Sequence, residues 1–461
     1  MGENKICIRV KFSEEILSQR LNYVLNFIEN HPLCINRLTF HTGVEAQNDI
    51  VLNYGCQGSD SIFMPANLFL FTDKVKTPVK LYTNKYLWKD GVIYDISEVL
   101  NDGLNNFFEN SQVGFDVFET IFFHLSRIEE IWMENSCKES GYWMREDDLL
   151  LIRENIYDVP VVDHLVVALM QVMGIYPQEK LTEFVLTHDI DKIYKYNSIV
   201  DGMKAAIWPV IFRKSLIDGF KNLYYFVKVW LGRLKDPYDS FHFLLNKENF
   251  WKEKIIFFMA GGKSNFDLFD KFYQRDFHEI LEIANYNGYI TGLHPSYYSG
   301  SDETMFLKEI EFLEGHCGHE VVHSRQHWLR FFHNITPSML EKYDIKTDHT
   351  LGYARNIGFR CGTGFEFNLY HFEDERPYVF KSRPLIIMDS ALIHYCREDM
   401  DRFSQILEDF LSKNLSNTCI TFNFHNSTFD YTLGERKKIE KIYLKMIDKV
   451  KEQFLLTNKI A

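Results

Sequence analysis

Two acidic side chains in the run LTHDID have the spacing of a shared catalytic or metal site. Asp189 and Asp191 are two positions apart, and on a β-strand side chains two apart point to the same face. A divalent ion bound to one carboxylate would keep both ionised and leave the other as a base within reach of a metal-bound water. The same Asp-x-Asp pattern also caps turns at strand ends, so both interpretations stay open for the pair alone.

Histidine and arginine side chains later in the chain could complete such a site. His294 ends the run YITGLH, and Arg325 and His327 repeat the spacing of two in SRQHW. A strand through SRQHW would turn that guanidinium and that imidazole toward one face. Imidazole and carboxylate ligands suit zinc or a similar divalent ion, with positions left open for water and substrate. We therefore predict Asp191, His294 and His327 as metal ligands, although these separate segments form no spacing signature of the HExxH kind.

Three further residues are candidates for acid–base and positioning roles. His425 ends the run FNFH, and an imidazole that titrates near neutrality could act as the general acid that protonates a departing amine. Asp389 in IIMDSAL is the natural partner to orient that imidazole. Arg360 lies among glycines in GFRCGTGF, where it would hold the catalytic Asp or a substrate oxygen, or form a structural salt bridge. For the neighbouring Cys361 we expect burial rather than nucleophilic chemistry.

The elements that must position these residues are short β-rich runs that alternate with helical stretches. Such alternation predicts a parallel sheet or a (β/α) barrel, and in barrels the reacting groups gather at the carboxyl ends of the strands. The candidate residues fall at such ends, which favours a barrel of about seven strands over residues 179–461. The predicted strands lie within residues 184–191, 254–262, 289–296, 321–328, 356–364, 385–392 and 419–426.

Residues 1–178 predict a smaller mixed α/β domain. Strands are expected at residues 6–12 and 38–42, and helices at residues 116–132 and 158–174, the second ended by Gly174 and Pro177. We place the domain boundary at about 178. Glu129 and Glu130 late in the first helix are assigned a structural role, on a solvated face or in a contact to the next domain.

A helical insertion at about residues 192–250 interrupts the alternation of predicted strands and helices in the barrel. Between Lys192 and Lys235 there are nine Lys or Arg residues against Asp201 and Asp218, interleaved with Trp, Phe and Tyr. The insertion is either a helical cover packed on the barrel or a peripheral contact to an anionic membrane surface.

Composition excludes several classes of protein. The 461 residues carry 51 Lys and Arg against 64 Asp and Glu, a formal net charge of -13, which argues against a nucleic-acid partner. The hydrophobic content of 46% indicates folded domains. The first ten residues lack a secretory layout, and no window offers the roughly 18 apolar residues of a spanning helix. Eight scattered cysteines favour reduced thiols and a cytoplasmic protein.

The order of the motifs THDID, GLHPS, RQHW, GFRCGTGF and FHN resembles the polysaccharide deacetylase family, whose catalytic domain is an irregular NodB-type (β/α) barrel. The resemblance is to the branch with THD-x-D in place of TFDDG and covers residues 179–461. The first 178 residues look like the uncharacterised domain that often precedes this branch in bacterial proteins, with SRIEE as its most recognisable stretch. The resemblance implies that Asp189 is the general base, Asp191 a metal ligand, His425 the general acid and Arg325 the arginine that braces the base.

The chain departs from the family pattern at one metal ligand. The second motif usually places two histidines four apart, whereas Tyr298 stands four residues after His294. His327 is the proposed replacement, with His188 as the alternative. Either the metal site is rebuilt in this way or the metal is lost.

These observations predict a zinc-dependent carbon–nitrogen hydrolase that removes an N-acetyl or similar acyl group from an amino sugar. A cytoplasmic enzyme, or one at the inner face of the membrane, would act on a nucleotide- or lipid-linked carbohydrate precursor of surface polysaccharide. Deformylation or another C–N cleavage would use the same groups. The alternative from another class is a non-catalytic carbohydrate-binding or assembly protein on a deacetylase-like barrel.

Overall fold

The computed structural model divides the chain into two compact units, which we call the N-terminal unit and the barrel unit. The N-terminal unit contains Met1–Leu181, Gly358–Pro384 and Ser416–Thr418, and the barrel unit contains Thr182–Ile357, Leu385–Leu415 and Cys419–Ala461. The structure describes residues 5–44, 49–56, 62–66, 70–71, 87–88, 91–92, 116–136, 145–177, 180–212, 214–245, 248–267, 273–391, 400–432 and 436–460.

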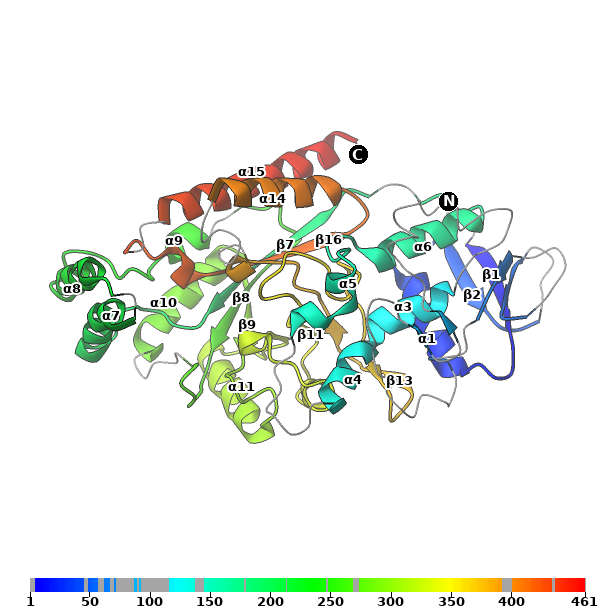
Figure 1. Ribbon diagram of the computed structural model, residues 1–461, viewed down its shortest axis with the longest axis horizontal. Helices are drawn as coiled ribbons and strands as arrows, with labels where there is room; N and C mark the ends of the chain where they lie inside the picture. The colour runs from blue at the N-terminus through cyan, green and yellow to red at the C-terminus, as the bar shows by residue number, and fades with distance from the viewer. Residues whose placement is uncertain are drawn as a thin grey trace. The chain divides into compact units, whose positions relative to one another are not determined.

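The barrel unit contributes seven strands to a sheet that curls into half a barrel, in the order β11-β10-β9-β8-β7-β16-β15 (Figure 1). These strands are β7 (Glu183–Ile190), β8 (Glu253–Met259), β9 (Ile290–His294), β10 (His323–Ser324), β11 (Thr347–Asp348), β15 (Ile387–Met388) and β16 (Cys419–His425). The three long central strands are buried along almost their whole length. Near-continuous apolar runs with parallel pairing, as in β8 and its neighbours, are typical of a sheet covered on both faces.

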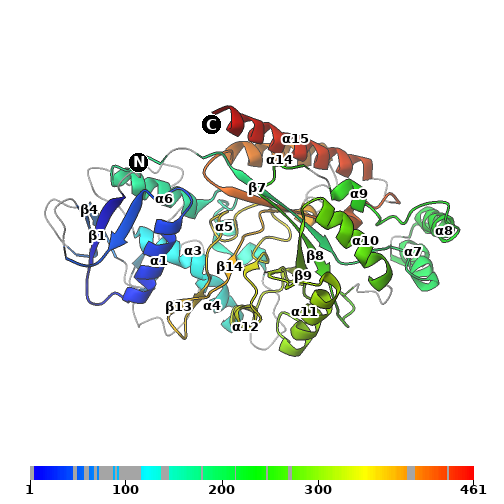
Figure 2. The same ribbon diagram turned by 180° about the vertical axis from the view of Figure 1, so that it is seen from behind.

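Helices surround this sheet. Figures 1 and 2 show α14 and α15 side by side next to β7 and β16, with α10 and α11 near β8 and β9. The helices of the unit are α7 (Ile199–Phe212), α8 (Leu216–Trp230), α9 (Phe241–Leu244), α10 (Tyr273–Tyr286), α11 (Glu303–Cys317), α12 (Thr336–Lys342), α14 (Met400–Lys413) and α15 (Arg436–Ile460), with 3-10 turns η3 (His327–Leu329) and η4 (Asn426–Phe429). In the part of the chain that the structure describes, no helix is both long and apolar enough to cross a membrane.

The predicted α/β fold, a parallel curled sheet after a smaller α/β domain, is confirmed. Six of the seven predicted strands lie in the sheet, but residues 356–364 form turns instead. The glycines of this run explain the difference: Gly362 has a positive φ of 67°, and a Cβ on Gly358 would lie 2.2 Å from the Tyr157 carbonyl oxygen. Two strands of two residues each were not predicted: β11 in the barrel unit and β14 (Lys381–Ser382) in the segment Gly358–Pro384 of the N-terminal unit.

The N-terminal unit contains a four-stranded parallel sheet in the order β2-β1-β3-β4. The predicted strands are confirmed as β1 (Ile6–Phe12) and β2 (Leu38–His41), and β3 (Ile50–Tyr54) and β4 (Ile62–Met64) extend the sheet. A separate antiparallel pair is formed by β5 (Leu87–Trp88) and β6 (Gly91–Val92). The helices are α1 (Ser18–Asn30), α3 (Val117–Ser126), α4 (Ile128–Ser136), α5 (Leu150–Arg153) and α6 (Val161–Val172), with the 3-10 turn η2 (Glu146–Asp148).

The helix predicted at residues 116–132 is two helices. The chain breaks between α3 and α4 at Arg127, whose φ of 53° is left-handed. The Arg127 guanidinium is buried and donates to the His124 carbonyl oxygen and to Glu130. These bonds hold the backbone in a conformation that a continuous helix does not allow.

The compact units run differently from the predicted domains. Position 178 lies outside the described residues, and the units divide after Leu181, but Gly358–Pro384 belongs to the N-terminal unit rather than to a continuous 179–461 barrel. Its short antiparallel pair is β12 (Tyr370–His371) with β13 (Arg376–Pro377). Hydrogen bonds explain the grouping, because the Val162 amide donates to the Gly362 carbonyl oxygen at 2.7 Å and the Tyr23 hydroxyl donates to the Asn368 carbonyl oxygen.

Arg360 is part of this grouping and not of a catalytic cluster. Its Nη2 lies 2.7 Å from Glu130 Oε2 and its Nε lies 2.9 Å from Glu130 Oε1, and both side chains are buried. The predicted role of Arg360 at the catalytic Asp is thus replaced by its alternative, a structural salt bridge. Glu129 is also buried and accepts the Leu150 amide at 2.7 Å, so neither glutamate lies on a solvated face.

We predict that Arg360→Met lowers the free energy of unfolding by about 3 kcal/mol or more, because it removes one of the two cations that compensate the buried Glu130. Chemical unfolding followed by tryptophan fluorescence measures this change. The matched control is Arg376→Met, since Arg376 forms an exposed pair with Asp374, and it should cost no more than about 1 kcal/mol. Unchanged stability in Arg360→Met would contradict the structural role.

Candidate metal-binding site

The predicted catalytic and metal-ligating residues of the barrel unit lie together at the carboxyl ends of its strands. Asp189 lies in β7 and is aligned with His425 at the end of β16, while His294 ends β9 beside the end of β8. Asp191 and Arg325 follow directly after β7 and β10. Parallel strands present their carboxyl ends at one edge, and this edge collects the reacting groups in α/β barrels.

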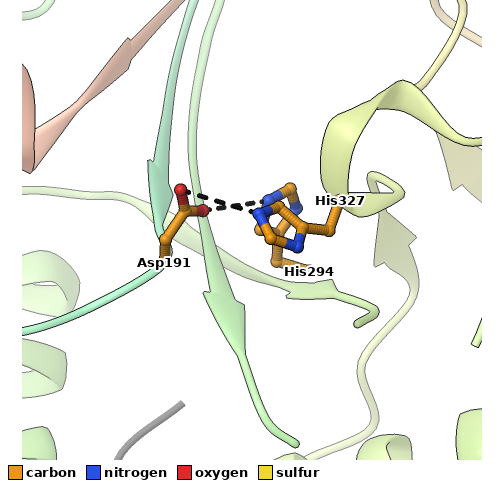
Figure 3. A group of neighbouring side chains, drawn as sticks. All are labelled: Asp191, His294 and His327. Carbon is orange, nitrogen blue, oxygen red and sulfur yellow. Dashed lines mark ion pairs between the residues drawn. The ribbon is translucent and has the colours of Figure 1, made fainter. Parts of the chain in front are cut away.

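Asp191, His294 and His327 form a compact group of three possible metal ligands. Their nearest ligand atoms all lie within 4.8 Å of one another. His294 Nε2 lies 3.2 Å from Asp191 Oδ1, and His327 Nε2 lies 3.8 Å from Asp191 Oδ2. Figure 3 shows both imidazole rings turned toward the carboxylate.

The second nitrogen of each imidazole is already bound, which fixes the ring for ligation. His294 Nδ1 donates to the Arg325 carbonyl oxygen at 2.6 Å, and His327 Nδ1 lies 3.4 Å from Asp267 Oδ1. Both rings therefore direct Nε2 at Asp191, as metal-ligating histidines held by a carbonyl or a carboxylate do. Burial acts to raise the pKa of Asp267, but hydrogen bonds from His327, the Tyr297 amide and Ser264 lower it to about 2.

The donor atoms of this group are suited to a cation. Asp191 Oδ1 and His294 Nε2 are buried and have no hydrogen bond among the described residues, and buried polar atoms seldom stay unsatisfied without a reason. Burial acts to raise the pKa of Asp191, but His294, His425 and His327 together lower it below its usual value. An ionised carboxylate and two oriented imidazoles match the ligand preference of zinc and similar divalent ions.

His327 reaches this group from a turn and not from the predicted strand. Strand β10 ends at Ser324, and His327 begins η3, in which Trp328 has a left-handed φ of 59° and is exposed. The alternative ligand, His188, lies beside Asp189 on β7 and so points to the other face of the strand. Its Nδ1 bonds to the Phe424 carbonyl oxygen at 3.0 Å, and burial lowers its pKa to about 4. Of the two alternatives, the structure brings His327 to Asp191.

Asp189 is held beside the ligand group by a buried arginine and an amide. Arg325 Nη1 lies 2.8 Å from Asp189 Oδ1, and Asn423 Nδ2 donates to Asp189 Oδ2 at 2.8 Å. Burial of the carboxyl group acts to raise its pKa, but Arg325, His294 and His425 outweigh it and hold the pKa below its usual value. The carboxylate is therefore ionised at neutral pH and can accept a proton.

His425 faces the two carboxylates from the neighbouring strand β16. Its Nδ1 lies 2.8 Å from Asp389 Oδ1, and its amide donates to Asp389 Oδ2 at 2.7 Å. Its Nε2 points to Asp189 Oδ2 at 3.8 Å and to Asp191 Oδ2 at 4.0 Å. Burial acts to lower the pKa of His425, but Asp389, Asp191 and Asp189 raise it to about 10, so the ring is protonated at neutral pH.

Three residues of the site were not predicted from the sequence. Thr187 and Asn423 precede Asp189 and His425 by two positions, and both contact Arg325 Nη1, at 2.8 and 2.7 Å. The sequence signal that could have found Thr187 and Asn423 is the spacing of two that related Asp189 to Asp191, because side chains two apart on a strand share a face. Asp267, which holds His327, lies in an irregular segment after β8 and gave no such signal.

Comparison with known proteins gives one family match and several matches among solved structures. A family of unknown function (DUF7033) matches residues 10–175. No curated protein matches the chain. Among solved structures, the chain is similar to a protein from Mycobacterium smegmatis described as a "putative polysaccharide deacetylase", with 12% identity, a TM-score of 0.34, and coverage of 59% of this chain and 85% of that chain.

Two other solved structures have lower identity. One is a mutant of a CE4 family pseudoenzyme with restored enzymatic activity, with 8% identity, a TM-score of 0.27, and coverage of 59% of this chain and 64% of that chain. The other is a polysaccharide deacetylase from Bacillus cereus, with 8% identity, a TM-score of 0.26, and coverage of 57% and 88%.

We predict that His294→Ala and His327→Ala each weaken zinc binding by at least about 100-fold, because removing a ligand should cost no less than removing a group that orients one. A competition titration with a chromophoric chelator measures the affinity. The control Tyr298→Phe should leave it unchanged, since Tyr298 is about half exposed and lies outside the ligand group. Wild-type affinity in His327→Ala would contradict the proposed ligand set.

Asp389→Asn should lower the pKa of His425 by about one unit or more, because a neutral amide no longer favours the imidazolium. His425 would then lose its proton at a lower pH than in the wild type. NMR titration of the imidazole Cε1–H signal in the metal-free protein measures the shift. Asp374→Asn, which changes an exposed carboxylate of the N-terminal unit, is the control, and an unmoved His425 titration in Asp389→Asn would contradict the assignment.

Proposed function

We propose that the chain is a metal-dependent hydrolase that removes an N-acetyl or similar acyl group from an amino sugar. The observation that carries this proposal is one arrangement: a base-competent Asp189 and a protonated His425 face the group of Asp191, His294 and His327. Hydrolysis of an amide needs a proton acceptor for water, a proton donor for the amine and a site that stabilises the developing oxyanion. The residues in this arrangement offer all three.

The ligand group would provide the site that stabilises the developing oxyanion. Asp191, His294 and His327 would hold a divalent ion, with zinc as the best match to two imidazoles and a carboxylate. When bound, such an ion polarises a carbonyl group and lowers the pKa of water. The ring orientation imposed by the Arg325 carbonyl oxygen and Asp267 supports this assignment.

Asp189 and His425 divide the proton transfers between them. Arg325 and Asn423 fix the Asp189 carboxylate and keep it ionised, so it accepts the proton of the attacking water. Asp389 holds His425 Nδ1 and leaves the Nε2 proton directed into the site, where it can be donated to the departing amine. Environments that push the pKa values of two titratable groups apart in this way are typical of an acid–base pair.

The sequence resemblance to polysaccharide deacetylases supports an N-acylated amino sugar as the substrate. We place the reaction in the cytoplasm or at the inner membrane face, on a nucleotide- or lipid-linked precursor of surface polysaccharide. The six described cysteines are free thiols, in keeping with a reducing compartment. The non-catalytic alternative would bind the same carbohydrate without releasing acetate.

Asp189→Asn should lower kcat for acetate release by on the order of 10²-fold or more, the usual contribution of a positioned acid or base, while zinc stays bound. Asp191→Asn should instead lose the metal. The assay measures acetate released from free, nucleotide-linked and lipid-linked N-acetylated amino sugars, together with zinc content.

Two outcomes would overturn parts of this proposal. Exchanged phenotypes of the two variants would reverse the assignment of base and ligand. The non-catalytic alternative would be supported if the zinc-loaded wild type bound a substrate but released acetate no faster than Asp189→Asn does.

A further inference from the structure

Helices α7 and α8 carry more exposed large apolar side chains than any other segment of the described chain. We call this pair the helical hairpin. Figures 1 and 2 show its two helices side by side and projecting from the end of the barrel unit. Large apolar patches on a protein surface mark a binding site for a partner or a membrane. The most exposed side chains are Ile199, Val200, Ile211, Phe212, Leu216, Ile217, Phe220, Tyr224 and Trp230.

The hairpin buries its inner face against itself. A Cβ on Gly202 would lie 2.3 Å from the ring of Phe226, and a Cβ on Gly219 would lie 2.5 Å from Val210 Cγ2. Glycine at these positions therefore lets the helices contact each other closely, with Ala206 and Phe226 buried. The outward faces are left uncovered, which does not fit the prediction of a cover helix packed along the barrel.

Cations accompany this apolar surface. Within the described part of the chain, Lys204, Lys214, Lys221 and Arg233 form no ion pair with a carboxylate. Asp201, one of the two acids of the hairpin, is already paired with Lys192 at 3.5 Å. The hairpin is thus positively charged in a chain whose formal net charge is -13.

We propose that the helical hairpin docks the protein on the surface of an anionic lipid membrane. Apolar side chains would enter the boundary between headgroups and acyl chains while the cations contact anionic headgroups. A second copy of the chain is a poorer occupant, because a two-fold contact places the same surface on both partners and would bring the cations of one copy toward those of the other. An anionic leaflet complements both the charge and the apolar character of the hairpin.

The dimensions of the hairpin favour insertion in the interface. Helices of 14 and 15 residues extend about 21 to 22 Å, less than the roughly 30 Å of a hydrocarbon core. Membrane-surface helices of this kind have large apolar side chains on one face and Lys or Arg near the polar boundary. Trp208 and Trp230 are both exposed, and tryptophan is enriched at the depth of the headgroups.

The chain segments that enter and leave the hairpin are hydrogen-bonded next to the proposed catalytic residues. Asp236 accepts the amides of Lys195 and Tyr196 at 2.7 and 3.0 Å, which ties the entering and returning chains together. Asn426, next to His425, donates to the carbonyl oxygens of Lys192 and Tyr238 at 2.9 and 3.1 Å. Docking would therefore hold the strand ends that carry the site at a fixed place near the lipid surface.

Vesicle flotation of the full chain tests the docking proposal. The protein should float with phosphatidylcholine vesicles that contain phosphatidylglycerol, less with phosphatidylcholine alone, and less at high salt. Ile217→Ser with Phe220→Ser should lower the partition coefficient at least about tenfold, since two of the most exposed apolar side chains are lost. Lys204→Ser with Lys214→Ser should lower binding to the anionic vesicles only. Circular dichroism verifies that each variant is folded.

The matched control is Leu444→Ser with Leu455→Ser, which removes two exposed apolar side chains of α15 and should leave flotation unchanged. Equal recovery of the wild type with neutral and anionic vesicles would overturn the proposal. Unchanged flotation of the variant Ile217→Ser with Phe220→Ser would also overturn it. The proposal would also fail if the wild type did not float but formed a concentration-dependent dimer without lipid, and if Ile217→Ser with Phe220→Ser abolished that dimer. The test needs neither zinc nor substrate, so its result is independent of the proposed hydrolase activity.

Discussion

The buried Arg325 guanidinium allows two carboxylates to share the carboxyl end of β7. Asp189 and Asp191 would repel each other in a buried site, and an uncompensated buried charge costs several kcal/mol. Arg325 is fully buried and contacts Thr187, Asp189 and Asn423 through Nη1, with its guanidinium over the ring of Phe257 at 4.5 Å. Its own carbonyl oxygen also holds His294 Nδ1. One residue thus balances the charge of the proposed base and orients a proposed metal ligand.

Much of this site could be predicted because it follows the alternation of β-strands. The long apolar strands β7, β8 and β16 were recognisable from composition. The period of two related Asp189 to Asp191, and His425 was recognised as the end of the run FNFH. The pairing of His425 with Asp389 also followed from the chemistry of an imidazole next to a carboxylate. Local geometry of this kind is available to sequence reasoning since neighbouring strand ends meet at one edge.

Positions on irregular backbone could be predicted only in part. His327 was predicted as a ligand on a strand, but it lies in a 3-10 turn beside a left-handed Trp328. Asp267, which orients His327 from an irregular segment, follows no period and was not predicted. For Arg360 the sequence left a site role and a structural salt bridge open. The structure shows the salt bridge, because Gly358 packs closely on Tyr157 and the guanidinium pairs with Glu130, 230 residues away in the sequence. Pairings at such a distance in sequence leave no local pattern.

The discontinuous make-up of the N-terminal unit has a consequence for biosynthesis. Residues up to Leu181 leave the ribosome before Gly358–Pro384, the segment that supplies Arg360 to Glu130 and the Gly362 carbonyl oxygen to Val162. Until that segment is translated, the nascent N-terminal residues lack the β12–β13 pair and one of the two cations for a carboxylate that is buried in the native state. The native contacts of this unit are therefore complete only after most of the strands of the barrel unit have emerged, and a fragment ending at residue 181 would lack the contacts that Gly358–Pro384 supplies.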